Sequence, residues 1–161
     1  MRSRTAVLVA VTSVLTVASP ALAGPVRAAV HDAATDWKYV HRQVFGVSLR
    51  DFLATRSAAP DRWFDWSTDG CSAPLLGGSG ANYDFTEACV RHDFAYRNLR
   101  MLERRYGTGR TFWNAANRAL VDQRFLTDMR AHCRRRSILL RLGCYGWAQV
   151  YFSAVRVLGG P

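Results

Sequence analysis

Apolar residues recur at three- and four-residue spacing over most of this chain, which is the pattern of amphipathic helices. The pattern predicts a helix from about Thr35 to Leu53, with a second short stretch beginning at Val47. Further helices are predicted from Phe85 to about Tyr106, from about Thr111 to Arg134, and from about Gly146 to Val157. No pair of strands is convincing. The sequence therefore predicts an all-α fold.

Residues that break helices separate these segments. Ala58–Asp61 contains a proline, and the stretch from Phe64 to Tyr83 is rich in glycine, so the latter is predicted to be a loop. Asp84, with Glu87 three residues later, resembles a capping signal for the next helix. The apolar side of the last predicted helix consists of Trp147, Val150, Tyr151 and Val155.

The N-terminus has the pattern of a secretory signal peptide. Arg2 and Arg4 precede an apolar run from Ala6 to Ala18, and Ala21-Leu22-Ala23 is a cleavage motif. A run of about 13 apolar residues is shorter than the roughly 20 that a membrane span requires. We therefore expect residues 1–23 to be removed, or a later cut after Ala28 or Ala29, and the protein to be secreted. Residues 24–161 then form a single domain, with 24–34 a candidate disordered segment.

The four cysteines are expected to be oxidised, because export delivers the chain to an oxidising compartment. Four cysteines allow three pairings. The most local pairing, Cys71–Cys89 with Cys133–Cys144, is preferred. A zinc site is disfavoured because the sequence has no C-x-x-C motif and no nearby histidine pair.

The chain is strongly basic. Its formal net charge is +10, and removal of Arg2 and Arg4 with the signal peptide leaves +8. Such a surface favours anionic partners, either phospholipid headgroups or nucleic acid. Nucleic-acid binding rests on charge alone, so no nucleic-acid partner is predicted. The clustered arginines are either headgroup contacts or a solvated basic face: Arg104, Arg105, Arg110, Arg134, Arg135 and Arg136.

Two predicted helices place a histidine opposite an aspartate. His92 shares an inward face with Cys89 and Tyr96, and Asp122 interrupts the apolar stripe of the following helix. A short glycine-containing turn joins the helices, so they can pack antiparallel with Asp122 facing His92. A carboxylate on one imidazole nitrogen leaves the other free to take a proton from water, which makes a general base for hydrolysis. The alternatives are a core histidine satisfied by a hydrogen bond and an Asp122 that faces solvent.

A second pair of carboxylates indicates a cation site. Asp93 lies about 100° around the helix from His92. Asp69 lies in the loop, and a Cys71–Cys89 bond would hold it against Asp93. Two carboxylates with loop carbonyls suit Ca²⁺. The alternative is that Asp69 caps a turn while Asp93 pairs with an arginine such as Arg97.

Four segments together resemble the secreted phospholipase A2 family of the bacterial and fungal type: DWSTDGC at 65–71, ACVRHDFAYRN at 88–98, ALVDQRFLTDM at 119–129 and WAQVYFSAVRVLG at 147–159. The resemblance extends from about Phe64 to the C-terminus. It implies a small disulfide-stapled domain in which two long antiparallel helices carry the active site beside a calcium-binding loop. The glycine-rich loop and the HDxCY cysteine of the animal enzymes are absent, and segment 72–83 differs from the family pattern.

The resemblance also implies a role for each site residue. His92 would activate the attacking water, and Asp122 would orient His92. Asp69 through its carboxylate, Gly70 through its carbonyl oxygen, and Asp93 would hold Ca²⁺. The reaction would cleave the sn-2 ester and release a free fatty acid and a lysophospholipid. The enzyme would act as a monomer on an anionic membrane or micelle surface.

Two other functions are alternatives on the same residues. A cationic lipid-binding or membrane-disrupting protein with little turnover would suit the charge and four tryptophans expected to be exposed: Trp37, Trp63, Trp66 and Trp113. A metal phosphohydrolase would need several more histidine ligands, and the remaining ones, His31, His41 and His132, form no comparable dyad.

Overall fold

The computed structural model describes residues 30–58, 60–71 and 77–159 of the chain. The predicted signal peptide, with its cleavage site, lies outside the described residues. The elements are α1 (Ala33–His41), the π-helical turn η1 (Arg42–Gly46), α2 (Leu49–Ser57), β1 (Ser79–Gly80), β2 (Tyr83–Asp84), α3 (Thr86–Tyr106), α4 (Ala115–Arg134) and α5 (Ile138–Leu158). The protein is thus a small helical domain with two disulfides, as predicted.

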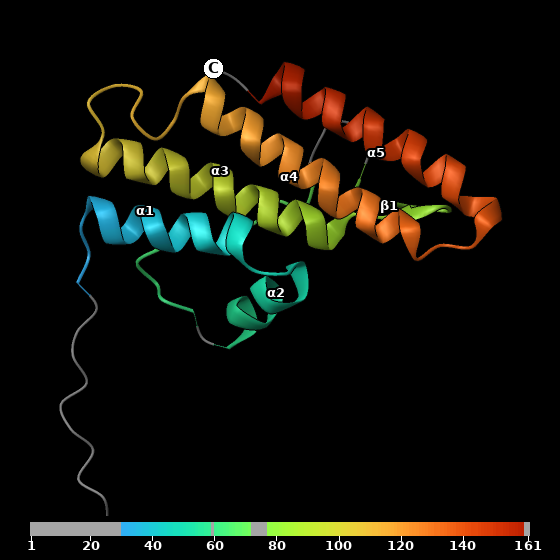
Figure 1. Cartoon of the computed structure of the whole chain (residues 1–161), viewed down its shortest axis with the longest axis horizontal. Helices are drawn as coiled ribbons and strands as arrows, with labels where there is room; N and C mark the ends of the chain where they lie inside the picture. The colour runs from blue at the N-terminus through green and yellow to red at the C-terminus, as the bar shows by residue number, and fades with distance from the viewer. Residues whose placement is uncertain (1–29, 59, 72–76, 160–161) are drawn as a thin grey trace, which may run out of the picture.

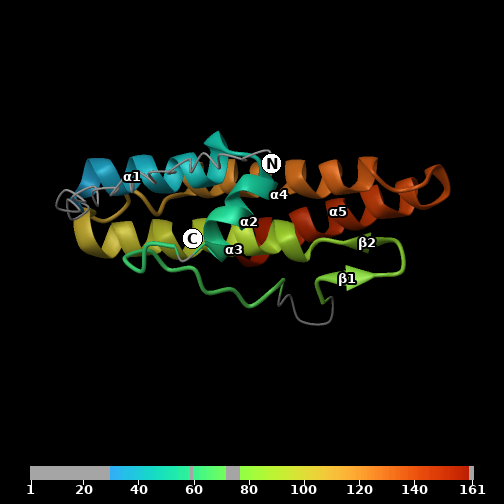
Figure 2. The same ribbon diagram turned by 90° about the horizontal axis from the view of Figure 1, so that it is seen from below.

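Two long helices, α3 and α4, form the centre of the fold. Figure 1 shows α5 against α4 on one side of this pair and α1 beside α3 on the other, with the short α2 below α3. Figure 2, seen from below, shows α2 in front of α3. One core cluster fills the space between the N-terminal helices and α3, with Val40, Phe52, Phe94 and Leu102 at its centre. A second cluster joins α3, α4 and α5 through Phe85, Phe125, Met129 and Ala148. The helix pair that was predicted to carry the site is therefore buried from both sides.

The disulfides attach the less regular parts of the chain to this core. Cys71 is bonded to Cys89, which ties the loop before β1 to α3. Cys133 is bonded to Cys144, which ties the end of α4 to the first half of α5. This is the most local of the three possible pairings. The first of these bonds fixes the predicted cation loop beside the predicted base.

Several predicted boundaries were wrong near helix starts. α4 begins at Ala115 and not at Thr111, because the Glu103 carboxylate accepts hydrogen bonds from the backbone N–H groups of Phe112 and Trp113 and holds that segment as a loop. α1 begins at Ala33, inside the segment expected to be disordered, because Asp32 caps it. In each case a side-chain hydrogen bond decides the boundary.

The segment before α3 also differs from expectation. Ser79 pairs with Asp84 and Gly80 with Tyr83 in a two-residue antiparallel ladder, so the absence of strands was a wrong prediction. The Asp84 capping signal was wrong as well, because the N-cap of α3 is Phe85 and makes no side-chain cap. Asp84 instead accepts a hydrogen bond from the Thr86 N–H, as in a turn.

α5 is longer and lies differently from the predicted helix. It begins at Ile138, eight residues before the predicted start at Gly146. Val150, expected on the apolar side, is 45% exposed. The other three predicted residues, Trp147, Tyr151 and Val155, do pack against the core, where Cys144 and Ala148 are also buried. Across the residues described, none of the helices combines the length and the apolar character that a bilayer crossing needs.

Candidate active site

His92 and Asp122 face one another across the α3–α4 interface. The Nε2 atom of His92 lies 3.0 Å from Oδ1 of Asp122. Asp122 is fully buried and His92 is 9% exposed. The rings of Tyr96 and Phe125 pack against the imidazole, with centroids 4.2 and 4.7 Å away. These contacts fix the ring orientation and let Nε2–H donate to the carboxylate, so that Nδ1 carries the lone pair.

Asp122 has further partners on α3, α4 and α5. The Tyr96 hydroxyl donates to Oδ1 at 2.6 Å, and Nη1 of Arg156 on α5 donates to Oδ2 at 3.0 Å. The Nε atom of Arg118 lies 3.9 Å from Oδ2. Burial alone would raise the pKa of Asp122, but the hydrogen bonds from His92, Tyr96 and Arg156 outweigh it and hold that pKa below its usual value. Asp122 is thereby kept ionised although it is buried.

Hydrogen bonding to Asp122 also affects Tyr96. Burial and the hydrogen bond to the carboxylate both raise the pKa of the Tyr96 phenol, so the hydroxyl stays protonated and remains a donor. The position of Tyr96, four residues after His92, was the one sequence signal for this contact. Arg156 gave no such signal, because no spacing along the chain relates this residue of α5 to Asp122.

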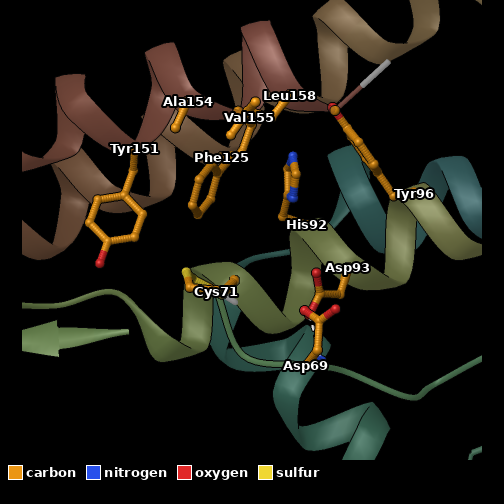
Figure 3. Close-up of a pocket in the computed structure, with 12 residues that line it drawn as sticks. Asp69, Cys71, His92, Asp93, Tyr96, Phe125, Tyr151, Ala154, Val155 and Leu158 are labelled. Carbon is orange, nitrogen blue, oxygen red and sulfur yellow. Dashed lines mark hydrogen bonds between the residues drawn. A yellow bond between two sulfur atoms is a disulfide. The ribbon is translucent and has the colours of Figure 1, made fainter. Parts of the chain in front are cut away.

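His92 opens onto a pocket of about 310 Å³. Its polar end contains Asp69 and Asp93, and its other walls are largely apolar side chains from α4 and α5: Phe125, Tyr151, Ala154, Val155 and Leu158. Figure 3 shows the imidazole between the two carboxyl groups on one side and the α5 side chains on the other. A pocket of this kind can hold a molecule with a polar reacting group and an apolar tail.

Residues of α3 hold the loop that carries Asp69. Asn98, fully buried, donates through Nδ2 to the carbonyl oxygen of Asp65 at 2.8 Å and accepts from the Asp65 N–H at 2.9 Å. The Cys71–Cys89 bond fastens the other end of this segment to the same helix. Contacts within the protein thus hold this loop at both ends.

Asp93 holds the middle of the loop. Its Oδ2 atom accepts hydrogen bonds from Oγ1 of Thr68 at 2.5 Å, from the Asp69 N–H at 3.1 Å and from the Gly70 N–H at 3.3 Å. Asp69 pairs with Arg97, whose Nη2 lies 3.4 Å from its Oδ2. The alternative interpretation of the sequence paired Arg97 with Asp93, but Arg97 pairs with Asp69. Gly70 has a φ of +67°, which favours glycine.

The oxygen atoms at this end of the pocket suit a hard cation. In Figure 3 the carboxyl groups of Asp69 and Asp93 point toward one another, and two carboxylates at one place favour a cation between them. Among the residues that the structure describes, no group of three or more histidine, cysteine or acidic side chains could hold a metal ion. Backbone carbonyls such as that of Gly70 would have to supply the remaining oxygens.

The comparisons with known proteins agree with the resemblance seen in the sequence. Curated relatives include the secretory phospholipase A2 of Beauveria bassiana, which is 34% identical over 74% of this chain. This chain spans only 56% of that relative's length. The secretory phospholipase A2 of Arthroderma benhamiae is 33% identical over 73% of this chain and 75% of the relative. The sequence profile of prokaryotic phospholipase A2 matches residues 40–159, a stretch that includes every residue of the pocket. By this match, which covers most of its length, the chain belongs to the prokaryotic phospholipase A2 family.

Proposed function

We propose that this protein is a secreted, calcium-dependent phospholipase A2 that hydrolyses the sn-2 ester of glycerophospholipids. The observation that carries the proposal is the buried His92–Asp122 pair at a pocket with two carboxylates at one end and apolar walls at the other. The proposal includes cleavage after residue 23 and a single domain over 24–161. Family membership and the relatives' name, secretory phospholipase A2, support it.

His92 is the general base in this proposal. Because Nε2–H is bonded to Asp122, Nδ1 can take a proton from a water molecule as that water attacks the ester carbonyl. The imidazolium that forms is stabilised by the ionised Asp122, whose charge is maintained by Arg156 and Tyr96. His92 then returns the proton to the leaving alcohol, which gives a fatty acid and a lysophospholipid.

Asp69, Asp93 and the carbonyl oxygen of Gly70 would hold Ca²⁺. Calcium bound there supplies a positive charge that polarises the ester carbonyl and stabilises the oxyanion. The protein's own contribution is to fix the donors: Thr68 orients the Asp93 carboxylate, and the disulfide of Cys71 keeps the loop beside α3. The apolar walls of the pocket would take an acyl chain of the substrate.

The test is fatty-acid release from mixed phosphatidylcholine/phosphatidylglycerol vesicles, first with millimolar Ca²⁺ and then with excess EGTA. We expect sn-2 release that stops with EGTA. His92→Gln should lower the rate by about 10²–10⁴-fold, the range for loss of a general base. His41→Gln is a matched control, because His41 is exposed and lies outside the pocket. Equal rates for the His92 variant and the native protein would remove His92 from the mechanism.

The same experiment distinguishes the proposed enzyme from the alternative, a cationic lipid-binding protein with little turnover. The alternative predicts vesicle binding without release in either condition. The four tryptophans give this function less support than expected, because Trp63 is exposed while Trp37, Trp66 and Trp113 are half-buried. The exposed apolar residues Leu139 and Leu142 favour lipid contact under either function.

A further inference from the structure

α5 presents an uncharged face to solvent. Its exposed residues at three- and four-residue spacing lie on one side of the helix. We call them the α5 outer face: Leu139, Leu142, Gly146, Val150, Ser153 and Val157. Leu139, Leu142 and Val157 are 89%, 81% and 79% exposed. With 1.5 Å per residue, the face is about 27 Å long.

This face is unusual for so basic a protein. The chain has 22 lysine and arginine residues, yet none of the exposed residues of α5 is charged. The helix has two charged residues, and both are engaged elsewhere. Arg156 binds Asp122, and Arg141 donates to the carbonyl oxygens of Arg134 and Arg136. Single exposed apolar residues are ordinary, but two leucines and two valines along one uncharged helix face mark a contact surface.

The N-terminal end of the face is basic. Arg134 and Arg135 are exposed, and they directly precede the turn into α5. Neither forms a salt bridge with an acidic side chain in the described part of the chain. Leu139 follows within a few residues, so positive charge and apolar surface meet at one place. That combination fits a surface with anionic headgroups above an apolar layer.

The other end of the face reaches the pocket. Val157 belongs to the α5 outer face, and the next residue, Leu158, lines the pocket and is 69% exposed. In Figure 3 Leu158 and Val155 stand over the same space as His92. A lipid layer that contacts α5 along its length would therefore extend to the mouth of the pocket.

We propose that the α5 outer face, with Arg134 and Arg135, is the surface through which this protein docks on an anionic phospholipid bilayer. α5 would lie in the plane of the interface, with Leu139 and Leu142 inserted among the headgroups. The inference rests on the proposed function, because it names the partner that delivers substrate to the same pocket. A second copy of the chain fits the face less well, because α5 contains no acidic residue to pair with the partner's arginines.

The test separates docking from turnover. Binding to phosphatidylcholine/phosphatidylglycerol vesicles is measured by co-sedimentation in EGTA, which stops hydrolysis. Leu139→Gln combined with Leu142→Gln should weaken binding by about 100-fold, since two leucines lose their contact with lipid. The control is Leu120→Gln, a 58% exposed leucine on α4, which should stay within about two-fold of the native protein.

A charge variant tests the other half of the surface. Arg134→Gln combined with Arg135→Gln should weaken binding to the anionic vesicles by about 25-fold and leave binding to pure phosphatidylcholine unchanged. Arg104→Gln with Arg110→Gln removes the same charge from exposed positions away from α5 and should have a smaller effect. Equal losses in the two charge variants would mean that net charge, and not this surface, attracts the vesicle, and would overturn the proposal.

Three further outcomes are decisive. Unchanged vesicle binding by the leucine variant would overturn the proposal. A dimer in lipid-free solution that the leucine variant converts to monomer would assign the face to a second copy and also overturn it. Vesicle binding that depends on these leucines in a protein that hydrolyses no phospholipid would support the docking surface while refuting the proposed function. Hydrolysis of a short-chain phospholipid in monomeric solution should be unchanged in the leucine variant.

Discussion

Arg156 is the most informative residue to replace, because it joins α5 to the predicted catalytic pair. Its Nη1 atom donates to Oδ2 of Asp122 at 3.0 Å, and Asp122 is fully buried. Arg156→Met removes the guanidinium and keeps an unbranched apolar stem. The hydrogen bonds from His92 and Tyr96 to Oδ1 remain in this variant, so Asp122 loses one partner and not all of them.

The expected loss of stability follows from the geometry. A hydrogen bond to a charged group contributes roughly 1.5–3 kcal/mol. Arg156 is 36% exposed, and Nε of Arg118 stays 3.9 Å from the same carboxylate oxygen. Solvent screening and this second cation both reduce the loss, so we expect the free energy of unfolding at neutral pH to fall by about 1–1.5 kcal/mol.

The stability loss in the Arg156 variant should depend on pH. The pKa of Asp122 is lowered in the fold, so this carboxylate stabilises the protein above its unfolded pKa and the stabilisation is lost as pH falls through the folded pKa. Without Arg156 the folded pKa rises toward the unfolded value. The difference in unfolding free energy between native protein and variant should therefore be largest at neutral pH and shrink toward zero in acid.

Urea unfolding at a series of pH values measures this difference. Arg130→Met is the control, because Arg130 is an exposed residue of α4 outside the pocket and it should change stability little at any pH. A stability loss of the same size in acid as at neutral pH would refute the reasoning, since it would mean that Arg156 acts through packing and not through the charge of Asp122.

Three other predictions concern the loop carboxylate Asp93, the second disulfide and the core. Asp93→Asn should weaken Ca²⁺ binding sharply in a calcium titration, and an unchanged titration would place the cation elsewhere. Replacing both Cys133 and Cys144 by serine should lower the free energy of unfolding by roughly 2–4 kcal/mol in urea melts with an unchanged helical circular dichroism spectrum; an unchanged midpoint would contradict this. Leu102→Ala, at a fully buried core position, should cost about 2–5 kcal/mol by the same assay, whereas exposed Leu120→Ala should cost far less.

The helical periodicity was sufficient to predict that His92 and Asp122 lie close together. Each lies on the inward face of a long helix, and an acidic residue in an apolar stripe needs a buried partner. The short connection between the helices left few ways to pack them. The contact at 3.0 Å is therefore a consequence of patterns that extend over whole helices, which are the most robust part of a sequence pattern.

Features that depend on single long-range contacts could not be obtained in this way. The start of α4 is decided by Glu103, which belongs to the preceding helix. The Asp93 side chain binds the loop N–H groups at Asp69 and Gly70, and periodicity carries no information on loop backbone orientation. The true start of α5 was missed because its first turns present leucines to solvent, and the periodicity argument assumes that apolar residues face inward.

The exposed leucines of α5 also indicate the role of this helix. A helix that only closed the core would bury its leucines and expose its arginines, and α5 does the reverse along much of its length. Arg156 is turned inward to Asp122, while Leu139 and Leu142 are turned outward. Arg118 donates to the carbonyl oxygen of Arg156, so α4 holds this part of α5 directly above the predicted base. α5 thus connects the proposed lipid-contacting face to the residue that keeps Asp122 ionised, and the charge variants at 134–135 and at 156 examine the two ends of that connection separately.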